Sequence, residues 1–113
     1  KAALENTFFS SLYSPDDTSD LNKDFVAEYK KAYNTNPDVF AALAYDSTLL
    51  VAKAIEDAGS ADPAKIAEAM AKIKGFKGVS GEVTFNEQHN PIKSAVIIEH
   101  KDGKQTFKAK VNP

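Results

Sequence analysis

Residues 40–59, FAALAYDSTLLVAKAIEDAG, constrain the fold most, because they read as a helix that is apolar on almost every side. We expect a helix over residues 39–58 with Gly59 just past its end, since glycine suits the left-handed position there. The predicted buried positions are Phe40, Leu43, Ala44, Ala52, Ile55 and Ala58, with Leu49, Leu50 and Val51 widening the face. Such a helix needs other layers of structure to cover it.

Two more helices are predicted beside this one. Apolar residues recur at helical spacing over 21–33, with charged residues mainly on the opposite face, which indicates an amphipathic surface helix. Pro37 ends that pattern, because proline disfavours helical geometry in the residue before it. A third helix is predicted over 60–75, with Asp62 as its N-cap, Pro63 in its first turn and Gly75 at its end.

The remaining pattern is that of strands. A short strand running into a loop is predicted over residues 4–13, and three more strands over 81–85, 94–103 and 104–111. The Lys-Asp-Gly-Lys sequence between the last two favours a hairpin. The fold class is therefore α/β: a strand, three helices, then three short strands. These strands are too few to cover two nearly apolar helices, so we expect the chain to be part of something larger.

Composition excludes several function classes. The 113 residues are enough for one domain, and 42% hydrophobic with 27% charged residues is typical of a globular protein. No apolar run approaches the ~18 residues of a membrane span, and the first residues lack the apolar core of a signal peptide. The net charge is −2 and the chain has no arginine, so we expect no nucleic-acid partner. Cysteine is also absent, which excludes disulfides and thiolate chemistry.

Candidate catalytic residues are few. His89 falls in a polar turn and His100 in a strand, and neither has a nucleophile or a metal ligand at a recognisable spacing. Both are interpreted as ordinary surface residues. The glycines of residues 75–81 match no phosphate-binding pattern and indicate a flexible turn. The acids of residues 14–17 are too few for calcium. We therefore expect no enzyme activity, no cofactor and no metal.

Tyr45 and Asp46 stand out early in the apolar helix. A structural interpretation packs the Tyr45 ring in the core with its hydroxyl on a backbone partner. Asp46 would then favour the positive end of the helix dipole. A functional interpretation instead places the pair at a binding site. The residues alone leave both interpretations open, although a buried tyrosine is more often structural.

Several motifs occur together in one order: YSPDD, then Tyr-Lys-Lys-x-Tyr, Ala-Tyr-Asp and DPAKIAEAM, and last GVSGEVTFNEQHNPIKSAVIIEHKDGK. The last is the most specific, because it combines a Gly-x-x-Gly turn, a Thr-Phe-Asn strand end, Asn-Pro and a Lys-Asp-Gly hairpin. Over essentially its whole length, the chain resembles the C-terminal third of a branched-chain amino-acid-binding protein. These are periplasmic binding proteins that serve ABC importers.

The resemblance implies a type I periplasmic-binding-protein fold with two α/β lobes, of which this chain is one partial domain. Residues 1–13 and 94–113 would belong to one lobe and residues 19–85 to the other. The crossings would lie near 14–18 and 86–93, with Ser14, Pro15, Asn90 and Pro91 as hinge residues. The sheet that the apolar helices need would lie in the missing N-terminal two thirds.

The resemblance also implies a ligand-binding role for Tyr45, whose ring would contact the side chain of an amino-acid ligand. Asp46 would cap or orient its neighbour, with direct ligand contact less certain, and Tyr13 is a further candidate. The main binders of the ligand's α-carboxylate and α-amino groups would lie upstream of residue 1. We therefore expect the fragment to bind ligand poorly alone and to form homo-oligomers.

The expected partners of the whole protein are an amino acid and a membrane permease. Its expected location is periplasmic or extracellular, with a lipoprotein anchor as one possibility. Two alternatives remain at the level of sequence: a ligand-sensing receptor domain of the same fold, and a small self-associating structural domain. The sequence upstream and downstream of this chain would distinguish a receptor domain from a transport protein. The size of the chain in solution would distinguish a structural domain from both. The C-terminal end at KVNP favours transport.

Overall fold

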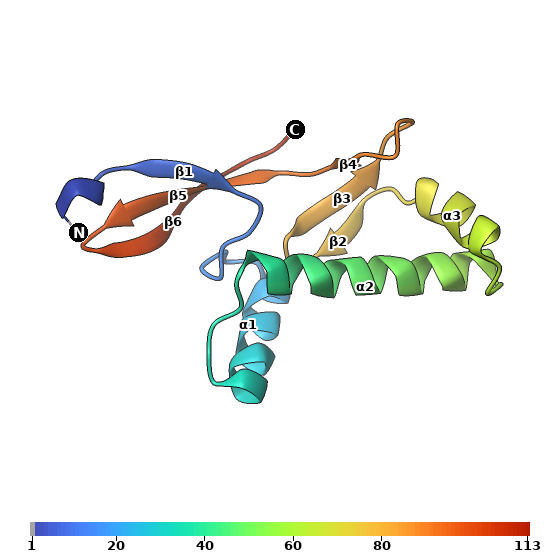
Figure 1. Cartoon of the computed structure of the whole chain (residues 1–113), viewed down its shortest axis with the longest axis horizontal. Helices are drawn as coiled ribbons and strands as arrows, with labels where there is room; N and C mark the ends of the chain where they lie inside the picture. Colours follow the sequence, from blue (N-terminus) through green and yellow to red (C-terminus); the bar gives the residue numbers. More distant parts are fainter. Residues whose placement is uncertain (1) are drawn as a thin grey trace.

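The computed structural model describes residues 2–113 and divides them between two small sheets and three helices (Figure 1). The chain begins with a 3₁₀ turn, and β1 precedes the helices while the other strands follow them. In order, the elements are η1 (Ala2–Leu4), β1 (Phe8–Ser11), α1 (Asp20–Tyr33), α2 (Val39–Ala58), α3 (Pro63–Ala71), β2 (Phe76–Gly78), β3 (Gly81–Phe85), β4 (Pro91–Ile92), β5 (Ala95–Lys101) and β6 (Lys104–Val111). The α/β class predicted from the sequence is confirmed.

The first sheet has the antiparallel order β1-β5-β6 and joins the two ends of the chain. β5 lies in the middle, pairing Phe9 of β1 with Ile98, and its alternate residues Val96 and Ile98 are buried. The predicted hairpin to β6 is confirmed. Asp102 and Gly103 both adopt the positive φ that a tight hairpin turn requires.

The second sheet has the antiparallel order β2-β3-β4 and lies beside α2 and α3 (Figure 1). One core cluster fills the space between these elements, because β3 and the end of α3 direct apolar side chains toward α2. Its buried members are Leu50, Ala54, Ile73 and Val83.

A second, smaller core cluster holds α1 and the start of α2 to the turn between β2 and β3. It contains Tyr13, Ala42 and Val79, with the half-buried Phe25 and Val39 packed against it. Ala42 is fully buried, which lets the backbone of α2 approach its neighbours closely. This cluster places the side chains of the candidate site.

Local signals at the helix ends are largely confirmed. The Asp62 carboxylate accepts hydrogen bonds from the first backbone N–H groups of α3, and Pro63 begins that helix. Gly59 follows α2 in the left-handed conformation. The predicted end of α3 at Gly75 is wrong. The helix ends at Ala71, because the chain turns there to place Ile73 in the core.

The strand predictions need three corrections. The first strand is shorter than residues 4–13, because the Thr7 hydroxyl and N–H bond back to the carbonyl of Leu4 and form a turn before Phe8. Part of the glycine turn at 75–81 is a strand, since β2 pairs with β3. Residues 91–92 also form a short strand, β4. Both added strands are too short to show periodicity in sequence.

The predicted buried face of α2 is correct at Leu50 and wrong at several other positions. Phe40 is 77% exposed and Ile55 is 42% exposed, and Ala52 is exposed too. The buried residues are Leu50 together with Ala42, Asp46 and Ala54, spaced by four along one stripe. A helix that is apolar all round has no preferred face in its sequence pattern. The face is chosen by small residues that permit close packing and by the hydrogen bonds of Asp46.

Candidate functional site

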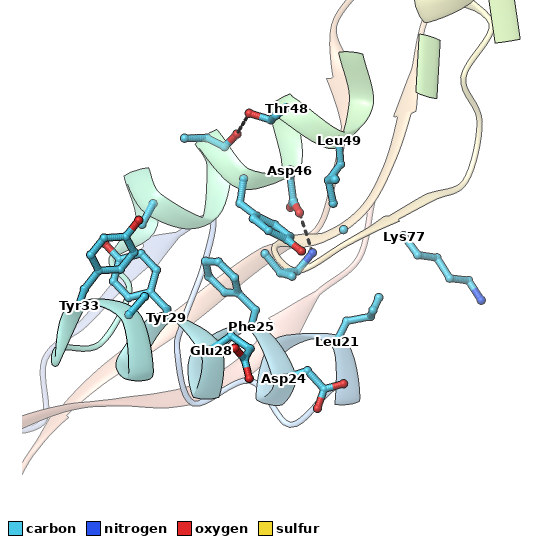
Figure 2. Close-up of a pocket in the computed structure, with 16 residues that line it drawn as sticks. Leu21, Asp24, Phe25, Glu28, Tyr29, Tyr33, Asp46, Thr48, Leu49 and Lys77 are labelled. Atoms are coloured by element: carbon cyan, nitrogen blue, oxygen red, sulfur yellow. Dashed lines mark hydrogen bonds between the residues drawn. The ribbon is translucent and has the colours of Figure 1, made fainter. Parts of the chain in front are cut away.

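An open cleft with a volume of about 700 Å³ lies between α1, α2 and the start of the turn that joins β2 to β3 (Figure 2). Most of its wall is apolar or aromatic. The charged residues Asp24, Glu28 and Lys77 are exposed, and Figure 2 shows the Lys77 side chain extending away from the aromatic rings. Asp46 also belongs to the lining, but it is buried. The arrangement suits an apolar group held between rings, with the exposed charged groups around it.

Aromatic side chains form the floor and one wall of the cleft. Phe25, Tyr29 and Tyr33 follow one another at four-residue spacing along α1, so they share one face. Neighbouring ring centroids in this row are 5.7 Å and 4.6 Å apart, within the range of favourable aromatic pairs. The Tyr45 ring reaches across from α2 and lies 4.8 Å from that of Phe25.

Tyr45 lies at the surface of this cleft. Its side chain is 45% exposed, with one side of the ring against α1. The structural interpretation of Tyr45 as a core residue is therefore wrong for the described chain. Its ring is positioned to contact a molecule or a protein segment that enters the cleft.

Asp46, the next residue, is buried, and its carboxylate faces the turn between β2 and β3. Its carboxylate accepts hydrogen bonds from the backbone N–H groups of Val79 (2.8 Å) and Ser80 (2.9 Å) and from the Ser80 hydroxyl. α2 begins at Val39, so Asp46 lies about two turns inside the helix. The dipole explanation is wrong, because that effect fades beyond the first turn. Asp46 instead ties the helix to the turn between β2 and β3.

Gly78 makes this contact possible. A Cβ atom added at Gly78 would lie 2.5–2.7 Å from three carboxylate atoms of Asp46. Only glycine therefore lets the turn approach the carboxylate this closely. The Gly-x-x-Gly turn of the sequence thus has a specific task, which is to carry two N–H donors to a buried acid.

Tyr13, the third candidate, is buried beneath the cleft. Its hydroxyl donates to the side-chain oxygen of Asn22 (2.8 Å), and its ring packs edge-on to Phe25. Burial, and then the nearby carboxylates of Asp17 and Asp46, raise the pKa of the Tyr13 hydroxyl above its ordinary value. Tyr13 therefore supports Phe25, which in turn contacts Tyr45.

Ser14 and Pro15, the first pair of expected hinge residues, lie in an ordered turn. Asn22 is fully buried, and its side-chain nitrogen donates to the carbonyls of Ser14, Pro15 and Asp17. This fastens the turn to α1. Burial opposes ionisation of Asp17, but hydrogen bonds from Lys110 and Ser19 outweigh it and hold its pKa below the ordinary value.

Asn90 and Pro91, the second pair, belong to the β3–β4 hairpin. The backbone of Asn90 bonds to Asn86 on the other side of the loop, and Pro91 pairs with Phe85. The chain leaves this sheet only at Lys93 and Ser94, which precede β5. The segment that passes between the two sheets is therefore shorter than the expected 86–93.

The histidines lie apart from the cleft. His89 is exposed in the β3–β4 loop, and His100 is half-buried on β5, where its Nδ1 lies 3.0 Å from the Thr7 hydroxyl. Within residues 2–113 there is no cluster of three side chains suited to a metal ion. No helix in the same range is long and apolar enough to cross a membrane.

Comparison with known proteins identifies the family. A model of the family described as "Periplasmic binding protein" matches residues 1–105. The chain belongs to the periplasmic-binding-protein family. A leucine-binding protein, LivK, from Thermotoga maritima is 39% identical to it, and the two structures superpose with a TM-score of 0.87 over 98% of this chain and 32% of that one.

Two further relatives bind amino acids. LivJ from Streptococcus pneumoniae, solved in complex with isoleucine, is 38% identical, with a TM-score of 0.81 over 96% of this chain and 31% of that one. A leucine-, isoleucine-, valine-, threonine- and alanine-binding protein from Pseudomonas aeruginosa is 36% identical over 89 residues, which is 75% of this chain and 23% of that protein. The chain thus spans about a third of the solved relatives and a quarter of the curated one.

Sequence reasoning named Tyr45 but missed the residues that hold it in place. Ser80 and Lys93 carried no recognised signal, because each acts through contacts distant in sequence. Phe25 was predicted only as part of an amphipathic face. The one available signal was the Gly-x-x-Gly turn, whose close approach to another backbone or side chain could have been suspected.

Proposed function

We propose that this chain is the C-terminal third of the solute-binding component of an ABC importer for branched-chain or related amino acids. The observation that carries the proposal is the Tyr45 ring, exposed on an aromatic cleft. Support also comes from relatives that bind leucine or isoleucine and match nearly the whole chain. An apolar cleft fits an aliphatic side chain, because such a side chain gains free energy from leaving water.

In this proposal the two sheets belong to two lobes. The sheet β1-β5-β6 is part of one lobe, and α1–α3 with the sheet β2-β3-β4 are part of the other. Their separation into distinct sheets, joined by residues 12–19 and 93–94, supports the division. Tyr45 would contribute one wall of the ligand pocket, and the charged ends of the amino acid would be held by residues outside this chain.

Asp46 and Tyr13 have indirect roles in the same proposal. The Asp46 carboxylate is engaged by Val79 and Ser80, so it orients α2 rather than the ligand. Tyr13 supports Tyr45 through Phe25. The chain would act by binding, without catalysis, in the periplasm or outside the cell, and the whole protein would deliver its ligand to a membrane permease. A lipid anchor on the whole protein is part of the same expectation.

The exposed apolar side of α2 supports the view that more of the fold is needed. Phe40, Val51 and Ile55 are all exposed to solvent in this chain. Large contiguous apolar surfaces of monomeric proteins are usually covered. We propose that a sheet from the rest of the protein covers them, and that the 113-residue chain alone self-associates and binds amino acids weakly. Light scattering over a concentration series would show the self-association. A chain that stays monomeric at high concentration would contradict it.

A chimera tests the ligand role of Tyr45. This chain would replace the matching third of LivJ from Streptococcus pneumoniae, and isoleucine binding would be measured by calorimetry. Changing Tyr45 to Ala removes apolar contact worth about 1–3 kcal/mol, so affinity should fall by roughly 5- to 150-fold. Tyr45→Phe retains the ring and should keep most of the affinity.

Phe8→Ala is the matched control, because Phe8 is an aromatic residue of β1 that is 55% exposed and does not line the cleft. It should bind isoleucine as the unmodified chimera does. Unchanged affinity in Tyr45→Ala with a lowered melting temperature would refute the ligand role and make Tyr45 structural.

A further inference from the structure

Two polar contacts lie where the sheet β1-β5-β6 meets the rest of the molecule. The chain passes between these parts twice, at residues 12–19 and at residues 93–94 (Figure 1). Each passage carries one partner of a contact between a lysine and a buried acceptor, Asp17 in the first passage and Lys93 in the second. Neither of these two lysines, Lys93 and Lys110, lines the cleft described above.

The first contact joins Lys93 to the turn that holds Asp46. The Lys93 ammonium group donates to the backbone carbonyl (3.0 Å) and to the hydroxyl of Ser80. That hydroxyl in turn donates to the Asp46 carboxylate. Burial lowers the pKa of Lys93 below its ordinary value, and the Asp46 carboxylate partly opposes this shift. A continuous polar chain therefore runs from the entry of β5 to the helix that carries Tyr45.

The second contact joins Lys110, on β6, to Asp17 in the passage before α1. The ammonium nitrogen lies 2.6 Å from a carboxylate oxygen, and the Asp17 side chain is only 10% exposed. The other carboxylate oxygen accepts from the N–H of Ser19, just before α1. A charged hydrogen bond that is largely shielded from water is stronger than an ordinary surface ion pair.

We propose that Lys93 and Lys110 set the orientation of the sheet β1-β5-β6 relative to the helices. Lys110 lies in the first sheet and Lys93 just before β5, whereas Ser80 lies in the turn between β2 and β3 and Asp17 lies just before α1. They restrain different passages of the chain, so together they oppose rotation of one part about the other. Neither lysine lines the cleft, so both act as positioning residues.

The consequence for ligand affinity rests on the proposed function. If the two parts are the two lobes, the lysines bias the equilibrium between their relative orientations. If the orientation that can bind ligand becomes less populated, the apparent affinity falls in proportion to its population. The groups that touch the ligand need not change. The orientation itself can be measured without any ligand.

Distance measurements on the 113-residue chain provide the test. The chain contains no cysteine, so cysteines introduced at the exposed positions Glu68 and Lys104 can carry a spin label on each part. An excess of unlabelled chain removes distances between molecules. Pulsed electron paramagnetic resonance would then compare the parent with Lys93→Met, Lys110→Met and the double variant. Methionine keeps much of the side-chain length and removes the charged donor.

Lys108→Met is the control. Lys108 pairs with Glu99 inside the sheet β5–β6, so its loss should leave the distance distribution unchanged. Each single variant should shift or broaden the distribution, and the double variant should do so most. A double variant with the parent's distribution overturns the proposal. If circular dichroism shows that the double variant does not fold, the two single variants decide by the same criterion.

Discussion

Replacing Asn22 by Ala should destabilise the chain more than any exposed polar substitution. Asn22 is fully buried and accepts from the Tyr13 hydroxyl at 2.8 Å. Its side-chain nitrogen donates to the carbonyls of Asp17 at 2.8 Å and Pro15 at 3.1 Å, with a longer contact to Ser14. Counting only the three short bonds at about 0.5–1.5 kcal/mol each gives a loss of about 1.5–4.5 kcal/mol.

Urea denaturation followed by circular dichroism would measure this loss at one low protein concentration, where self-association is smallest. The matched control is Asn36→Ala, because Asn36 is exposed and should change the unfolding free energy by less than about 0.5 kcal/mol. If Asn22→Ala costs no more than this control, the turn at residues 14–17 is not held by Asn22. The description of that turn as ordered would then be wrong.

Three further predictions concern stability. Leu50→Ala should lower the unfolding free energy by about 2–5 kcal/mol in urea denaturation, because Leu50 is in the core. Ile55→Ala should lower it clearly less, because Ile55 is 42% exposed. Equal losses would contradict the assignment of Leu50 to the buried face of α2. Because the pKa of Tyr13 is raised, the unfolding free energy should fall as the pH rises above about 10, and Tyr13→Phe should flatten that fall. Because the pKa of Asp17 is lowered, the unfolding free energy should fall as the pH drops below about 3.9. Lys110→Met should show a smaller fall over the same pH range, because it lacks the ion pair with Asp17. The same pH dependence in Lys110→Met and the parent would mean that the ion pair does not stabilise the fold.

Local chemistry explains which parts of the fold could be predicted from the sequence. Asp62 before Pro63, Gly59 after a helix and the Asp102-Gly103 hairpin each act on backbone groups within a few residues. Such signals are complete within a short window. They therefore placed the three helices and the last hairpin, with errors only near the ends.

Long-range contacts explain the errors. Asp46 bonds to residues 33 and 34 positions later, and nothing around Asp46 indicates that partner. Without it, an apolar helix offers several equivalent faces, so Phe40 and Ile55 were placed inside and are exposed. Tyr45 was selected through the resemblance to a family, because spacing alone could not separate a core tyrosine from a cleft tyrosine.

The most direct test of the central claim is a crystal structure of the LivJ chimera with isoleucine bound. The proposed function predicts the Tyr45 ring in van der Waals contact with the isoleucine side chain, at about 4 Å between carbon atoms. It also predicts the Asp46 carboxylate bonded to the turn at residues 79–80, as it is in the chain described here. The claim would be contradicted if isoleucine is bound in the chimera while the Tyr45 ring is buried against another part of the protein and makes no contact with the ligand.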